Sequence, residues 1–148
     1  MKRNEFVKQC SKGCLSLLIA PAVLQGCAGV KYTRASVQDN AMTLPVSSFK
    51  LVSGNGTTYA PFVVAENESL RYPICVYRTD DTTYNALWMR CTHRGTELRA
   101  YGDRLYCPAH GSEFTKSGAV QNGPADEPLK TFDVTVDGDQ LKINLALT

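Results

Sequence analysis

The chain has 148 residues, the length of one domain, and its composition of 43% hydrophobic and 20% charged residues is typical of a globular protein and excludes a disordered one. Its formal net charge of +2 comes from residues 1–26, because residues 27–148 carry twelve basic and thirteen acidic side chains. A near-neutral domain has no general electrostatic attraction for nucleic acid, so we expect no nucleic-acid partner.

Residues 1–26 have the pattern of a signal peptide. Basic side chains extend to Lys12, and an apolar run of about ten residues interrupted by Pro21 follows, whereas a membrane helix needs roughly 20. The next segment, Leu24-Gln25-Gly26-Cys27, resembles a bacterial lipobox, which implies that Cys27 is acylated and becomes the new N-terminus. The alternative is an ordinary cleavable signal with an unmodified cysteine. We therefore expect an exported lipoprotein, attached to the periplasm-facing cell membrane by a lipid anchor at Cys27.

Beyond the signal, residues 27–47 show no periodic pattern and are predicted to be the lipidated N-terminus and a tether, and residues 48–148 form the folded domain. Short runs rich in β-formers alternate there with turn residues. They are Ser48–Ser53, Tyr59–Ala65, Tyr72–Arg78, Ala86–Cys91, Glu97–Tyr101, Lys130–Val136 and Gln140–Leu145. Asp137-Gly138 between the last two is a hairpin signal. No ten-residue stretch after Cys27 shows a helical period, so the predicted fold class is all-β.

Two short motifs carry the metal-binding chemistry. Cys91-Thr-His93 and Cys107-Pro-Ala-His110 contain the only two histidines of the chain, and thirteen residues separate them. Thiolate and imidazole at such short spacing can converge on a metal from one tight loop each. A tetrahedral zinc site and a 2Fe-2S centre with two cysteine and two histidine ligands both use this set, so spacing alone leaves both open.

The wider context of these motifs resembles the Rieske 2Fe-2S family. A glycine follows closely after each histidine, and Gly123-Pro124 matches the proline-containing third loop of that family. The resemblance implies an antiparallel β-sandwich with a small cluster-binding subdomain and one 2Fe-2S cluster per chain, rather than zinc. It also implies that Cys91 and Cys107 hold one iron, and that His93 and His110 hold the other, more exposed iron.

The same resemblance assigns roles to side chains around the cluster. Ser112 stands where high-potential members have a hydroxyl that donates to a cluster sulfide, so we count it as cofactor-binding. Phe114 replaces a tyrosine whose hydroxyl donates to a ligand sulfur in those members. Thr96 and Ala109 occupy the places of two cysteines that form a clamping disulfide. We therefore expect no disulfide clamp and an intermediate reduction potential.

Several other residues have plainer interpretations. Cys75 lies in a strand-like run and is predicted to be a small core residue, and Trp88 is predicted to pack beside the first motif. Arg90, Arg94, Arg99 and Arg104 surround that motif and are predicted to form a solvated face rather than a steering surface.

The sequence thus predicts one-electron transfer through a Rieske-type cluster in a membrane-anchored lipoprotein without a catalytic site of its own. The partner would be a redox protein such as a cytochrome, reductase or oxidase. The alternative is a Rieske subunit of a larger quinol- or substrate-oxidising complex, and a structural zinc module is the remaining one. A catalytic oxygenase is excluded, because it needs two further histidines for a mononuclear iron.

Overall fold

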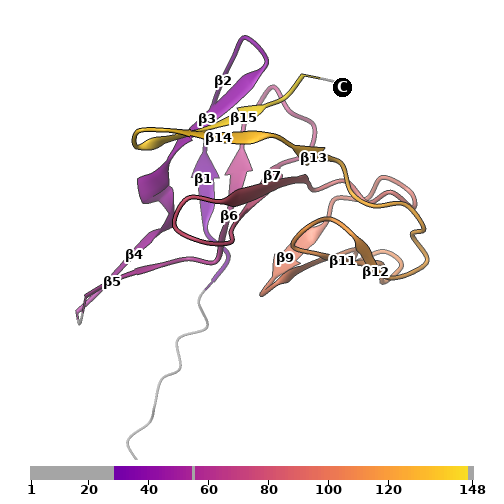
Figure 1. Ribbon diagram of the computed structural model, residues 1–148. Helices are drawn as coiled ribbons and strands as arrows, with labels where there is room; N and C mark the ends of the chain where they lie inside the picture. Colours follow the sequence, from indigo (N-terminus) through magenta and orange to yellow (C-terminus); the bar gives the residue numbers. More distant parts are fainter. Residues whose placement is uncertain (1–28, 55, 147–148) are drawn as a thin grey trace, which may run out of the picture.

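The computed structural model of the chain describes residues 29–54 and 56–146 (Figure 1). Within these ranges the regular structure consists of β-strands and one turn of 3-10 helix, η1 (Val46–Phe49). The predicted all-β class is therefore confirmed. The predicted signal peptide and Cys27 lie outside the described residues, and in the described part of the chain no helix is long and apolar enough to cross a membrane.

The centre of the molecule is a five-stranded sheet with the order β1-β6-β7-β8-β13. Its strands are β1 (Tyr32–Arg34), β6 (Phe62–Glu66), β7 (Ile74–Arg78), β8 (Tyr84–Trp88) and β13 (Thr131–Phe132). All pairs in this sheet are antiparallel except β1 with β6, which is parallel. That one pair departs from the purely antiparallel sandwich expected from the family resemblance.

Two further sheets and one hairpin complete the fold. One four-stranded sheet contains β14 (Val134–Asp137), β15 (Gln140–Asn144), β3 (Ala41–Pro45) and β2 (Ser36–Gln38), in that order. The other contains β12 (Val120–Asn122), β11 (Glu113–Thr115), β10 (Arg104–Tyr106) and β9 (Arg99–Tyr101). The hairpin of β4 (Lys50–Ser53) and β5 (Gly56–Tyr59) projects from the body of the molecule (Figure 1).

The central sheet has a hydrophobic core on each of its faces. Successive side chains of a strand point to opposite sides of the sheet, so one strand contributes to both cores. On β7, Cys75 and Tyr77 belong to a core shared with the β9–β12 sheet, whereas Ile74 and Val76 belong to a second core shared with β3 and β15. The first core also contains both motif cysteines. The β9–β12 sheet and the two cysteine motifs form the cluster-binding subdomain, which therefore packs on one face of the central sheet. The β14-β15-β3-β2 sheet packs on the other face.

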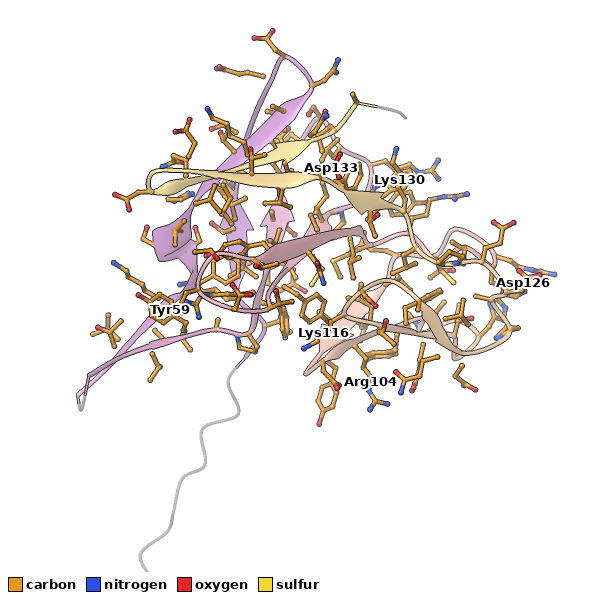
Figure 2. All side chains as sticks on the ribbon, in the orientation of Figure 1. Tyr59, Arg104, Lys116, Asp126, Lys130 and Asp133 are labelled. Atoms are coloured by element: carbon orange, nitrogen blue, oxygen red, sulfur yellow. The ribbon has the colours of Figure 1, made fainter. Side chains whose placement is uncertain are left out.

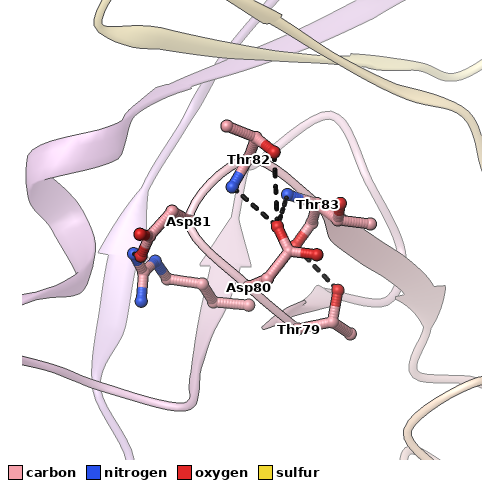
Figure 3. Close-up of polar contacts among 6 residues, drawn as sticks. Thr79, Asp80, Asp81, Thr82 and Thr83 are labelled. Atoms are coloured by element: carbon pink, nitrogen blue, oxygen red, sulfur yellow. Dashed lines mark hydrogen bonds and ion pairs between the residues drawn. The ribbon is translucent and has the colours of Figure 1, made fainter.

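The turn between β7 and β8 sets the register of the strand that leads into the first cysteine motif (Figure 3). Asp80 accepts hydrogen bonds from the backbone N–H groups of Thr82 and Thr83, each at 2.8 Å, and these bonds lower the pKa of its carboxyl group. The Thr79 hydroxyl donates to the Thr83 carbonyl oxygen at 2.9 Å. An aspartate that bonds the backbone two residues ahead closes such turns without help from the rest of the fold.

The tether predicted for residues 27–47 is wrong for residues 32–45, which form β1, β2 and β3. Met42 and Leu44 of β3 are fully buried and pair with Ile143 and Leu141 of β15. The folded domain therefore includes residues 32–45 and does not start at residue 48. The tether was predicted because β1 and β2 are only three residues long, which is too short for an alternating pattern to show.

Other predicted strands are found with shifted ends. The run Tyr59–Ala65 is split between β5 and β6, and the run Lys130–Val136 is split between β13 and β14. The hairpin expected at Asp137-Gly138 is confirmed: Asp137 pairs with Gln140, so Gly138 and Asp139 form the two-residue turn. Gly138 has φ 60°, the left-handed conformation that this turn type requires.

Candidate metal centre

The two cysteine–histidine motifs form loops on the cluster-binding subdomain. The first ligand loop, residues 91–96, follows β8 and is closed by a bridge between Arg90 and Glu97. The second ligand loop, residues 107–112, connects the antiparallel strands β10 and β11. A third loop, residues 123–129, lies against both, as the hydrogen bonds below show. Asp126 of this third loop marks one end of the molecule in Figure 2.

The two ligand loops have the same backbone hydrogen bonds although their histidines are spaced differently. In each loop the cysteine N–H donates to the carbonyl oxygen five residues ahead, and the cysteine carbonyl oxygen accepts from a glycine N–H four residues ahead. The bonds are Cys91 to Thr96 (2.8 Å), Gly95 to Cys91 (2.8 Å), Cys107 to Ser112 (2.8 Å) and Gly111 to Cys107 (3.0 Å). Gly95 and Gly111 have φ of 72° and 80°, which only glycine adopts without strain.

The four predicted ligands are arranged as an inner pair of thiols and an outer pair of imidazoles. Cys91 and Cys107 are each 1% exposed and lie in the core, whereas His93 is half-buried and His110 is exposed. The two imidazole rings form a T-shaped pair, with centroids 4.9 Å apart and an angle of 87° between their planes. The structure thus brings all four predicted ligands to one end of the subdomain, with the histidines toward solvent.

The buried imidazole nitrogen of His93 tests whether these residues fit a metal cluster. Its Nδ1 atom is buried and has no hydrogen-bond partner among the described residues. A buried nitrogen without a partner costs about 1–3 kcal/mol, and a neutral imidazole nitrogen is also a common metal ligand. An iron on Nδ1 would satisfy this atom, so the residues present fit the group.

Within residues 29–54 and 56–146, no three His, Cys, Asp or Glu side chains are arranged so that they could hold one metal ion together. A Rieske-type cluster distributes four protein ligands over two irons, with two cysteines on one iron and two histidines on the other. The grouping of like ligands in this site, two thiols inside and two imidazoles outside, matches that division.

The surroundings of Cys107 favour the ionised form of its thiol. Burial raises the pKa of its thiol, but hydrogen bonds from the backbone of His110 and Ala109 and from the side chains of Cys91 and Thr96 outweigh this effect. The net result is a pKa below the usual value for a cysteine. Because the thiolate is the form that binds iron, these hydrogen bonds favour the ligand state of Cys107.

The third loop connects the two ligand loops through side-chain hydrogen bonds. Ser112 is fully buried, and its Oγ accepts the Ala125 N–H at 3.0 Å. The Thr92 hydroxyl donates to the Glu127 carbonyl oxygen at 2.7 Å. Since a hydroxyl that accepts one bond still has its own hydrogen to donate, Ser112 remains free to donate a second one.

Two residues that support the site went unrecognised in the sequence. The Tyr72 hydroxyl donates to the Gly95 carbonyl oxygen at 2.7 Å and so attaches the first ligand loop to the segment that leads into β7. The Thr96 side chain, on the opposite loop, helps to lower the pKa of the Cys107 thiol. Thr96 was noted only as a replacement for a disulfide cysteine, and no local signal marks Tyr72, which lies 23 residues before its partner.

Cys75, Trp88 and the four arginines near the first motif are not part of the predicted ligand set. Cys75 is fully buried and burial raises the pKa of its thiol, so its prediction as a core residue is confirmed. Trp88 packs as predicted, with the Tyr72 ring edge-on to it at 5.5 Å. Of the four arginines around the first motif, three are exposed, whereas Arg104 is half-buried and its guanidinium lies 3.1 Å from the Glu113 carboxylate.

Comparison with known proteins identifies this class of site. The family model described as the Rieske [2Fe-2S] domain matches residues 47–133. The cytochrome b6-f complex iron-sulfur subunit of Synechococcus sp. (strain JA-2-3B'a(2-13)) is 39% identical over 56 residues, which are 36% of this chain and 33% of that protein. Subunit 1 of the same name from Synechocystis sp. (strain PCC 6803) is 41% identical over 56 residues, 36% of this chain and 32% of that protein. The chain thus spans about a third of the length of these curated relatives.

Among solved structures, the cyanobacterial plasma membrane Rieske protein PetC3 from Synechocystis PCC 6803 aligns with a TM-score of 0.49 and 26% identity, covering 56% of this chain and 85% of that one. The Sphingomonas yanoikuyae B1 ferredoxin aligns with a TM-score of 0.45 and 26% identity, covering 57% and 84%.

The fold and the family match define a 2Fe-2S electron-transfer domain. The chain belongs to the Rieske family, because the family model covers more than half of it. It carries one 2Fe-2S cluster, and the zinc alternative is set aside.

Proposed function

We propose that the chain is an exported lipoprotein that carries single electrons between its cluster and a redox partner protein. The observation that supports it most is the division of the site into buried thiols and outward imidazoles. Cys91, Cys107, His93 and His110 would be the ligands, and the cluster would supply a one-electron couple. Because His110 is exposed, it would offer the electron a way from the cluster to a partner in solution.

The chain's own residues hold the site rather than perform a reaction. Tyr72 attaches the first loop to the segment before β7, and Ser112 attaches the second loop to the third. These bonds keep the loops from rearranging when the charge of the cluster changes, which favours rapid electron transfer.

Membership in a larger oxidoreductase complex is the second candidate, and the names of the relatives favour it. Both of the cited cyanobacterial proteins are iron-sulfur subunits of a cytochrome b6-f complex. A copurification experiment separates the two candidates: gentle extraction from membranes would yield either the chain alone or a stable stoichiometric assembly with a cytochrome or another redox subunit.

The anchor is proposed from Leu24-Gln25-Gly26-Cys27. Substitution Cys27→Ser should leave unacylated precursor or soluble protein, because Cys27 is the only attachment point in the proposal. The test is fractionation followed by a carbonate wash and mass measurement of the N-terminal peptide. Membrane retention of Cys27→Ser after the wash, or an unmodified Cys27 in the native protein, would contradict the anchor.

A further inference from the structure

The start of the folded domain lies very close in sequence to the proposed anchor. Strand β1 begins at Tyr32, five residues after Cys27, and Val30 is three residues after it. An extended chain covers at most about 3.3–3.6 Å per residue, so Val30 can be no more than about 11 Å from Cys27 and Tyr32 no more than about 18 Å. An acylated Cys27 would therefore keep this end of the domain close to the bilayer.

We propose that the end of the domain formed by residues 30–32 and the β4–β5 hairpin rests on the lipid surface and directs the ligand loops away from it. This inference rests on the proposed lipid anchor and adds an orientation to it. A tether of twenty residues would have let the domain rotate freely, whereas a connection of about four residues would not.

Exposed apolar side chains gather at this end. Four of the six large hydrophobic residues that are exposed in the described ranges lie on it: Val52 (88% exposed), Tyr32 (59%), Tyr59 (42%) and Val30 (37%). Every residue of β5 is exposed, so the side chains of this strand are not buried in a hydrophobic core. Tyrosine is favoured at a membrane–water interface because its ring is apolar and its hydroxyl stays hydrated.

Basic groups accompany these apolar side chains. The Lys31 ammonium donates to the Lys50 carbonyl oxygen at 3.0 Å, which connects the beginning of the domain to β4. The Arg78 guanidinium lies over the Tyr59 ring at 4.3 Å, although it also pairs with Asp81. Lys31 and Lys50 have no acidic partner among the described ion pairs, so both can face anionic lipid headgroups.

The ligand loops lie at a different end of the molecule. Tyr59, at the base of the hairpin, and Asp126, in the third loop that binds both ligand loops, are on opposite sides of the view in Figure 2. With the hairpin on the lipid surface, His93 and His110 would face the aqueous phase. This orientation favours a partner that approaches from water, or through a domain that projects from the membrane, over one dissolved in the bilayer.

Tryptophan reporters test the orientation in the acylated, cluster-containing protein reconstituted into vesicles of phosphatidylcholine and phosphatidylglycerol with or without brominated acyl chains. Val52→Trp is the reporter in the hairpin, and Thr57→Trp, on the residue paired with Val52, is a second in case the first does not fold. Val136→Trp is the matched control, because Val136 is also an exposed strand residue (45%) but lies on β14, away from the hairpin (Figure 1). The native protein gives the Trp88 background.

Brominated chains quench tryptophan only on close approach, and interfacial side chains insert about 5–10 Å into the headgroup boundary. We therefore expect the hairpin tryptophan to lose at least about twofold more fluorescence than the one at position 136. Equal quenching at both positions, or none in the hairpin, would overturn the orientation. Flotation of the same vesicles separates this from the anchor: protein that floats without hairpin quenching refutes only the orientation, and protein that does not float refutes both.

Discussion

Removal of the Ser112 hydroxyl should change both the reduction potential and the stability, because its oxygen accepts a backbone hydrogen bond while its hydrogen stays free to donate to the cluster. The oxygen accepts the Ala125 N–H at 3.0 Å, and the hydrogen is left to donate to a cluster sulfide. A bond to the cluster strengthens when the cluster gains an electron, so it favours the reduced form. Ser112→Ala should therefore lower the midpoint potential.

The size of each effect can be estimated. For a one-electron couple, 59 mV corresponds to a tenfold change in the equilibrium constant, so a differential hydrogen-bond energy of about 1.4 kcal/mol would lower the midpoint by roughly 60 mV. Ala125 is 4% exposed, so its N–H would lose its acceptor in a buried position. That loss should lower the free energy of unfolding by about 1–3 kcal/mol.

Protein-film voltammetry with parallel thermal melts separates the two roles. Thr92→Val is the matched control, since the Thr92 hydroxyl also connects a ligand loop to the third loop but donates to the Glu127 carbonyl oxygen. The control should lose stability with little change in potential. If Ser112→Ala also melts earlier while its midpoint stays within about 10 mV of the native value, the hydroxyl only satisfies the backbone and the tuning role is refuted.

Two further substitutions test the ligands and their neighbours. His110→Cys, where a cluster still assembles, should lower the midpoint by at least about 100 mV and weaken its pH dependence, because a thiolate adds a negative charge that a neutral imidazole lacks; an unchanged midpoint in voltammetry would mean that His110 is not a ligand. Thr96→Val should lower the midpoint by tens of mV, because the Thr96 side chain favours negative charge on the Cys107 sulfur, and Thr96→Ser should restore it; equal midpoints for the valine and serine variants would show that the hydroxyl has no electrostatic role.

The Thr96 side chain bears on the intermediate reduction potential that the sequence predicts. Phe114 is fully buried and has no hydroxyl to offer a ligand sulfur, which contributed to the expectation of an intermediate potential. The Thr96 side chain of the opposite loop, however, helps to lower the pKa of the Cys107 thiol. The intermediate reduction potential therefore stays a prediction, and the Thr96 variants decide how much of the lost tyrosine bond is replaced.

The sequence by itself determined the chemistry of the site and the class of the fold. Cys91, His93, Cys107 and His110 were predicted from their spacing and context, and the burial of Cys75 followed from its β-rich run. These signals are local: a ligand loop needs only a few residues in a fixed order, and a buried strand shows its composition within five or six residues.

Only the tertiary structure decided what depends on partners far along the chain. Residues 32–45 became strands because β6 and β15, which begin 30 and 99 residues after the starts of β1 and β3, supply their hydrogen bonds and their core. Tyr72 supports the first ligand loop through a bond to Gly95, and Thr96 reaches a thiol of the other loop. No short pattern encodes such pairs, because each half is an ordinary residue until folding brings the distant segments together.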